Sequence, residues 1–252
     1  MARIISIHSF RGGTGKSNTT ANLAALLAAD GLRVGVIDTD IQSPGIHVLF
    51  GFGEDNIRHT LNDYLWGRCD ITATAHDVTA HLKGNLSGQI FLIPSSIRAG
   101  EITRVLRDGY DVSRLNDGIR QLVRALQLDI LLIDTHPGLN EETLLAIAIS
   151  HALVIILRPD QQDYQGTGVT IEVARQLDVP RLWLVVNKVP APLNLADVKA
   201  RIETTYGAEV AAVLPHSDEL MLLGSASIFA LQHPEHPVTA AYQQLAAKLT
   251  EE

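Results

Sequence analysis

The segment SFRGGTGKSN, near the start of the chain, carries residues whose types and spacing suit phosphate binding. Gly12, Gly13 and Gly15 have no side chain, so their backbone N–H groups can approach and surround an anion. Lys16 adds a positive charge that can reach phosphate oxygens, and the hydroxyl of Ser17 can bind Mg²⁺. The apolar run IISIH precedes the segment and a helical pattern follows it, which is the strand–loop–helix order of a P-loop. The sequence therefore predicts a nucleotide phosphate site here.

Two aspartates at the ends of apolar runs predict the metal part of the same site. Asp38 ends the run VGVID, and Asp134 ends DILLID, which is a Walker B pattern. Oxygen atoms are the ligands that Mg²⁺ prefers in proteins. We expect Asp38, Asp134 and Ser17 to hold Mg²⁺ beside the phosphates, Asp134 through a water molecule.

These residues need a sheet that brings their strand ends together. The chain alternates between continuous apolar runs, typical of buried parallel strands, and helical patterns. Expected strands cover Arg3–His8, Arg33–Asp38, Ile90–Pro94, Asp129–Asp134, Ala152–Leu157, Leu182–Asn187 and Val210–Leu214. Expected helices cover residues 17–30, 111–126, 139–149, 163–177, 193–206 and 237–250. This alternation predicts an α/β fold with a mostly parallel twisted sheet, helices on both faces, and ligands at the carboxyl ends of the strands.

The composition is typical of a globular protein in a reducing compartment. The chain has 252 residues, 46% of them hydrophobic and 19% charged, which fits one large α/β domain over residues 1–252. Cys69 is the single cysteine, so an intrachain disulfide and an all-cysteine metal site are excluded. No apolar run approaches the roughly 20 residues that span a bilayer, and the start is too polar for a secretory signal. We expect a cytoplasmic protein, and the net charge of −8 does not by itself indicate a nucleic-acid partner.

The glycine-rich segment departs from a standard Walker A motif, because Phe10 stands where the first glycine is usual. It resembles the deviant Walker A motif of the ParA/MinD family, KGGxGK[ST], and the segments VIDTDIQ and DTHPG are similar to the two switch segments of that family. The resemblance runs from Ala2 to about Asp218. It implies the three-layer fold of P-loop NTPases, binding of ATP and Mg²⁺, and hydrolysis of ATP.

The resemblance also implies roles for single residues. Arg11 occupies the position of a lysine that crosses to the partner's nucleotide in an ATP-bound homodimer; the alternatives are contact with its own phosphates and exposure to solvent. Asp40 aligns with the residue that positions the attacking water, so Lys16, Asp40 and Arg11 are the expected catalytic residues. His136 is expected to be a loop residue, because ATP hydrolysis needs no histidine. The N–H group of Gly138 is expected to sense the γ-phosphate.

Further nucleotide contacts are implied outside the switch segments. Thr14 and Asn18 complete the phosphate loop, and the N–H group of Asn18 would serve the α-phosphate. Asn187, at the end of LWLVVN, corresponds to the family's adenine-contacting asparagine, and Pro215 lies in a segment beside the base. The segment RPDQQDYQGT corresponds to a dimer-facing loop, and a polar strand-to-helix connection explains it equally well.

For the whole protein, the resemblance implies an ATP-dependent homodimer that positions or partitions a cargo on the nucleoid. The cargo would be a chromosome, a plasmid or a protein complex such as a microcompartment, and an adaptor protein would stimulate slow hydrolysis. Nonspecific DNA contact would use basic surface residues, with Arg181, Lys199, Arg201 and Lys248 as candidates. Membrane binding is not expected, because the apolar stripe of the last helix is typical of a packed helix and has one cation beside it. The stripe consists of Val238, Tyr242, Leu245 and Leu249.

Three other functions stay open at this point. One is an ATP-dependent metabolic enzyme of the dethiobiotin-synthetase type, and another is a MinD-like regulator of cell division at the membrane. The third is a nucleotide-binding scaffold with little hydrolysis, in which Arg11 disables the dimer trigger. Nitrogenase-like iron proteins of this branch need paired cysteines, which Cys69 alone does not supply.

Overall fold

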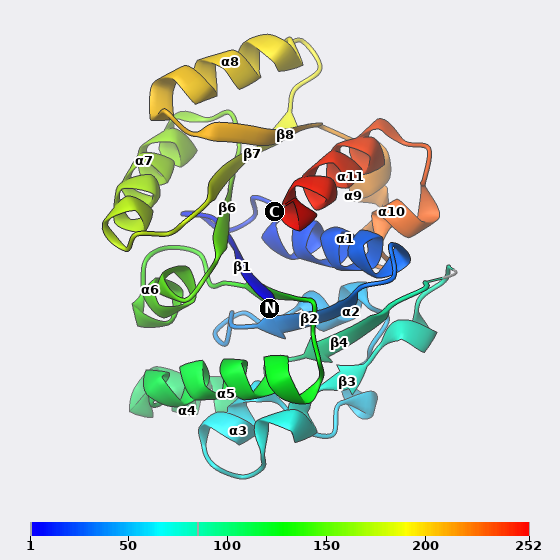
Figure 1. The fold of residues 1–252 in the computed structure, drawn as a ribbon, viewed down its shortest axis with the longest axis vertical. Coiled ribbons are helices and arrows are strands. Elements are labelled where there is room, and N and C mark those ends of the chain that lie inside the picture. Colours follow the sequence, from blue (N-terminus) through cyan, green and yellow to red (C-terminus); the bar gives the residue numbers. More distant parts are fainter. Residues whose placement is uncertain (1, 85, 252) are drawn as a thin grey trace.

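The computed structural model describes residues 2–84 and 86–251 and shows a central sheet with helices packed on it (Figure 1). Eight strands lie in the order β3-β4-β2-β5-β1-β6-β7-β8. Neighbouring strands are parallel, except that β3 runs antiparallel to β4. The strands are β1 (Arg3–His8), β2 (Arg33–Asp38), β3 (His76–Asp77), β4 (Gln89–Ile93), β5 (Ile130–Asp134), β6 (Ala152–Leu157), β7 (Leu182–Val189) and β8 (Glu209–Pro215).

The helices differ widely in length, and the long ones alternate with the parallel strands. The α-helices are α1 (Lys16–Ala29), α2 (Ile46–Leu49), α3 (Leu61–Leu65), α4 (Ala99–Asp108), α5 (Val112–Ala125), α6 (Glu141–Ala148), α7 (Gln161–Gln176), α8 (Leu195–Tyr206), α9 (Asp218–Leu223), α10 (Phe229–Gln232) and α11 (Pro237–Thr250). Three 3₁₀ helices are η1 (Glu54–Asn56), η2 (Ile71–Thr74) and η3 (Thr79–His81).

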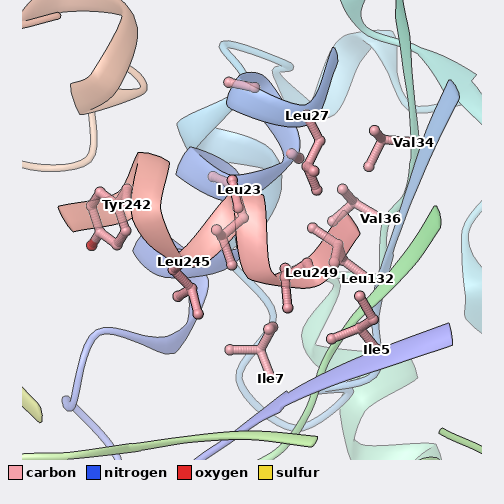
Figure 2. Packing of buried hydrophobic residues seen from close by; sticks show 14 of the residues in the cluster. Ile5, Ile7, Leu23, Leu27, Val34, Val36, Leu132, Tyr242, Leu245 and Leu249 are labelled. Carbon is pink, nitrogen blue, oxygen red and sulfur yellow. The ribbon is translucent and has the colours of Figure 1, made fainter. Parts of the chain in front are cut away.

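Alternate residues of the central strands face two separate helical layers. Ile5 and Ile7 of β1 belong to a core that includes α1 and α11, and Figure 2 shows Leu23 of α1 and Leu245 of α11 lying toward those strand residues. On the opposite face, strand residues such as Ile133 pack with α5 and α6, and β6 and β7 pack with α7 and α8. The prediction of a parallel sheet with helices on both faces is confirmed.

The last helix, α11, lies beside α1 and contributes its apolar stripe to the core (Figure 1). All four stripe residues named above are at most 1% exposed, and Tyr242 is the largest fully buried side chain. This burial is what the sequence predicts for a packed helix. Within the described residues, no helix combines the length and apolar character needed to cross a membrane.

The sequence pattern does not predict β3, α4 or the short helical elements α2, α3, α9, α10, η1, η2 and η3. β3 has only two residues and pairs with β4 at the sheet edge, which is too short for a periodic signal. Helix α4 buries a single side chain, Val105, so no apolar stripe of useful width marks it. The predicted strand ends shift by one or two residues: β4 ends at Ile93 and β7 continues to Val189.

Candidate nucleotide-binding site

The loop between β1 and α1 has backbone angles that only glycine adopts readily. Gly13 has φ of 76° and Gly15 has φ of 103°, both in the left-handed region. A Cβ atom on Gly15 would also lie 2.4 Å from Nδ2 of Asn187. Glycine is therefore required at position 13 by the backbone angles of the turn, and at position 15 also by the close approach of Asn187 of β7.

The first turn of α1 is arranged to receive an anion. Gly15 is its N-cap, no side chain caps the turn, and the turn contains no acidic residue. The N–H groups of this turn and the positive end of the helix therefore point toward the loop, and no side chain caps them. Lys16 is only 7% exposed, and its ammonium group forms no ion pair with any residue of the described chain. A phosphate group fits these donors.

Asp38 and Asp134 end adjacent strands and face each other in register. Both are nearly fully buried. The hydroxyl of Ser17 donates to Oδ2 of Asp134 at 2.6 Å, and the hydroxyl of Thr20 lies 3.3 Å from Oδ1. The three predicted metal ligands are thus brought to one point, and their oxygen donors suit Mg²⁺, which completes its shell with water and phosphate.

Burial and mutual repulsion make these carboxyl groups electrostatically costly. Desolvation raises the pKa of Asp134 to about 6, and the nearby Asp40 charge adds to the rise, while Lys16 and the Ser17 hydroxyl oppose it. Desolvation also raises the pKa of Asp38, and the charges of Asp134 and Asp40 contribute. A divalent cation bound between the two carboxylates would relieve this repulsion. The fit of the site to Mg²⁺ rests on the burial and mutual repulsion of Asp38 and Asp134.

A cavity of about 450 Å³ opens beside the loop and extends toward α9. Pro215 and Asn187 both line it, as the sequence predicts for a base-binding region, together with Lys16, Ser17 and Asn18. Asn187 also has a structural role that the sequence does not predict: its Nδ2 donates to the carbonyl of Thr14 at 2.7 Å and its Oδ1 accepts from the Lys188 N–H group at 2.8 Å.

The comparisons with known proteins agree with this geometry. Residues 2–179 match the family model described as AAA domain. An uncharacterised ATP-binding protein of Methanocaldococcus jannaschii is 29% identical over 99% of this chain and 88% of its own length. An iron–sulfur cluster carrier protein of Pseudomonas fragi is 30% identical over 96% of this chain and 83% of its own length. The solved structure of the septum site-determining protein MinD of Pyrococcus horikoshii, in complex with Mg-ADP, superimposes with a TM-score of 0.80 at 21% identity, covering 100% of this chain and 97% of that one.

The chain belongs to the ParA/MinD family of P-loop ATPases.

At the position of the family's signature lysine, Arg11 is held by its own chain. Its Nη1 lies 3.3 Å from Oδ1 of Asp160 and 3.2 Å from Oδ1 of Asp163, at the start of α7. Arg158 also binds both aspartates, at 3.0 Å to Asp163 and 3.2 Å to Asp160. Three residues of the predicted dimer-facing segment, Arg158, Asp160 and Asp163, therefore belong to an ion cluster within one chain.

Phe10, the other departure from the Walker A motif, packs on a glycine of α7. A Cβ atom added to Gly166 would lie 2.1 Å from Cδ1 and 2.2 Å from Cγ of the Phe10 ring. The bulky side chain therefore occupies space that exists only because residue 166 is glycine. The phosphate loop of this ParA/MinD-family chain is consequently attached to α7 both by this contact and by the Arg11 ion cluster.

The second switch segment is linked to the phosphate loop and to the first switch. The N–H group of Gly138, expected at the γ-phosphate, donates instead to the carbonyl of Ser9 at 3.2 Å. Nδ1 of His136 lies 2.7 Å from Oδ1 of Asp40. His136 is a loop residue, as predicted, and its ring also contacts Asp40, the residue predicted to position water.

The four basic surface residues proposed for DNA contact already have partners in the described chain. Lys199 pairs with Glu203 at 3.8 Å, and Lys248 pairs with Glu209. Arg201 donates to the Tyr164 hydroxyl at 3.1 Å, and Arg181 donates to the carbonyl of Glu251 at 2.8 Å. Carboxylates therefore offset the charges of Lys199 and Lys248, whereas Arg201 and Arg181 contact only neutral groups.

Proposed function

We propose that this protein is an ATP-binding and ATP-hydrolysing molecular switch that dimerises when ATP is bound. The observation that carries the proposal is the juxtaposition of Lys16, at the uncapped start of α1, with the buried pair Asp38 and Asp134. Positive donors for phosphate oxygens thus lie beside carboxylates that need a divalent cation. Mg²⁺ bound there would neutralise charge on the phosphates and on the leaving group.

Adenine is the base that the pocket supports. Asn187 and Pro215 line the cavity beside the phosphate loop, and the family resemblance assigns them to the adenine. Lys188 fixes the loop, because its Nζ donates to the carbonyl of Gly13 at 2.9 Å.

The homodimer requires Arg11 to leave its own aspartates and reach the partner's nucleotide. The side chains of Arg11 and Asp160 are 38% and 41% exposed, so their ion pair contributes only about 0.2–1 kcal/mol. Asp163 would remain paired after that release, because Arg158 binds it through Nε, Nη2 and its backbone N–H group. The low cost of release supports a crossing role for Arg11 once a more negative phosphate is offered.

The cellular role follows from the family and is part of the proposal. We infer positioning or partitioning of a cargo, which is a chromosome, a plasmid or a protein complex, with hydrolysis stimulated by an adaptor protein. A nucleoid surface stays a prediction, and the ion pairs of Lys199 and Lys248 with carboxylates do not strengthen it. A membrane surface is less supported, because the stripe of α11 is buried in the core.

A second candidate, suggested by the Pseudomonas fragi relative, is an iron–sulfur cluster carrier. A cluster is normally held by several thiolates. This chain has only Cys69, and burial raises the pKa of its thiol, assisted by the charges of Asp63 and Asp70. A raised pKa disfavours the thiolate that binds metal. The single cysteine and its raised pKa therefore favour the ATP-dependent switch over iron–sulfur cluster transfer.

Light scattering tests the proposal directly. The wild type, Asp40→Ala and Arg11→Ala are sized with Mg²⁺–ATP and with Mg²⁺–ADP. We expect a dimer only with ATP, a longer-lived dimer for Asp40→Ala, and a monomer in both conditions for Arg11→Ala. A size that ignores the nucleotide in every variant would refute the dimer switch. ATP turnover that requires a small acid substrate would favour the dethiobiotin-synthetase type, and ATP binding without turnover would favour the scaffold.

A further inference from the structure

Asp40 is held in one orientation by two donors on the same oxygen. Its Oδ1 accepts from the N–H group of Ser43 at 3.1 Å and lies 2.7 Å from Nδ1 of His136. Its other oxygen, Oδ2, accepts no hydrogen bond from the described residues. A carboxylate can only accept, so Nδ1 of His136 carries the hydrogen in this contact. The contact therefore assigns one carboxylate oxygen to the protein and leaves the other for a ligand.

The backbone that carries His136 is itself tightly supported. Thr135 donates its hydroxyl to the carbonyl of Ile7 at 3.0 Å and lies 2.8 Å from Nδ1 of the buried His8. The hydroxyl of Thr143, in the first turn of α6, lies 3.3 Å from the carbonyl of His136. The ring of His136 thus extends from a well-supported segment after β5 to Asp40, which lies in the loop after β2.

Both side chains are partly accessible to solvent. The side chain of His136 is 22% exposed and that of Asp40 is 15% exposed. A water molecule can therefore reach Oδ2 of Asp40, while the short contact on Oδ1 restricts rotation of the carboxylate. Orientation of a nucleophile matters strongly in phosphoryl transfer, where misplacement by about 1 Å can reduce the rate about a hundredfold.

We propose that His136 is a positioning residue for ATP hydrolysis, which fixes Asp40 through Nδ1 so that Oδ2 orients the attacking water. The inference rests on the proposed function. In the reaction the water oxygen bonds to the γ-phosphorus, the bond to the β–γ bridging oxygen breaks, and ADP leaves with that electron pair. The proton of the water ends on the released phosphate, so His136 is neither consumed nor changed.

Amide substitutions separate the two ring nitrogens. The side-chain nitrogen of asparagine reaches the place of Nδ1, whereas that of glutamine reaches the place of Nε2. The variants His136→Asn, His136→Gln and His136→Ala are compared with the wild type in single-turnover hydrolysis of Mg²⁺–ATP. Affinity for a fluorescent ATP analogue is measured in parallel. His59→Ala is the matched control, because His59 is an exposed histidine away from the site.

We expect His136→Ala and His136→Gln to lose about ten- to hundredfold in the hydrolysis rate with nucleotide affinity changed less than about threefold. His136→Asn should retain a rate within about threefold of the wild type. In the Asp40→Ala background, removal of His136 should cause no further loss, because both residues act through one carboxylate.

Three results would overturn the inference. A glutamine variant that keeps activity while asparagine loses it would mean that Nε2 contacts the water or substrate directly. Equal rates for all variants would mean that His136 has no role in hydrolysis. A parallel loss of nucleotide affinity would mean that the contact is only structural. If the wild type binds ATP but does not hydrolyse it, the proposed function fails together with the inference. The wild-type rate alone separates this case from the three results above, in which the wild type hydrolyses ATP.

Discussion

Replacing Asp134 by asparagine should stabilise the folded protein in the absence of nucleotide and metal while removing its Mg²⁺-dependent function. The pKa of Asp134 is about 6 in the folded state and 3.8 in its reference state, so the raised value disfavours folding of the charged form. A difference of about two pKa units corresponds to about 3 kcal/mol. Asparagine has nearly the same shape and keeps one acceptor, so the weakened contact with Ser17 or Thr20 costs about 1 kcal/mol. The net gain in the free energy of unfolding is therefore about 2 kcal/mol.

The sign of the pH dependence is fixed by the same shift. The penalty on the wild type is absent below the reference pKa of 3.8, grows as pH rises, and is complete above a pH of about 6. The advantage of Asp134→Asn should thus be about 2 kcal/mol at pH 8 and less than about 1 kcal/mol at pH 5. Loss of the Asp134 charge also lowers the raised pKa of Asp38, which acts in the same direction.

Chemical denaturation with EDTA, at pH 8 and at pH 5, measures the two free energies of unfolding. Asp129→Asn is the matched control, because Asp129 is exposed and immediately precedes β5, which Asp134 ends. Addition of Mg²⁺ and ADP should then stabilise the wild type more than Asp134→Asn. The reasoning is refuted if Asp134→Asn is less stable than the wild type at pH 8, or if the difference between them is the same at both pH values.

Three further variants test contacts around the site. Gly15→Ala should weaken nucleotide binding at least about tenfold in a fluorescence titration, because its φ is positive and its Cβ would meet Asn187; unchanged affinity would show that the loop tolerates a Cβ. Gly166→Ala should lower the free energy of unfolding by about 1–3 kcal/mol, because its Cβ would meet the Phe10 ring. In the double variant with Phe10→Ala, most of the loss caused by Gly166→Ala should disappear; additive losses of the two single variants would contradict this. Burial lowers the pKa of His8 to about 3 from 6.5, so stability should fall as pH drops below 6.5, and His8→Asn should make that fall shallower; an identical slope in a pH series of unfolding curves would argue against it.

The sheet and the phosphate loop could be predicted because both have strong local signals. The buried parallel strands are continuous apolar runs, and Gly15, Lys16 and Ser17 lie together in the chain. Asp38 and Asp134 could be placed together because each ends a strand of the same sheet. The functional roles of these residues, and the assignment of residues 1–252 to a single ATPase domain, stay predictions.

The contacts of His136 and Arg11 could not be predicted. His136 and Asp40 are 96 residues apart in sequence, and Arg11 and Asp160 are 149 apart. The strand pattern of a single sequence does not show which side chains of distant loops meet, since a histidine in a loop and an arginine near glycines have many available partners. The departures Phe10 and Arg11 are visible as anomalies, but the α7 residues that accommodate them are recognised only in three dimensions.

The position of β1 in the middle of the sheet has a consequence for how the chain is made. β1 pairs with β5, where Arg3 lies opposite Ile130, and with β6, where Ile5 lies opposite Ala152. At about 5–20 residues per second, a ribosome needs roughly 6–25 s to synthesise the intervening 127 or so residues. During that time the first strand lacks both of its native neighbours in the sheet. We expect the phosphate loop to acquire its final shape late in synthesis, and the nascent N-terminal segment to need shielding from aggregation until then.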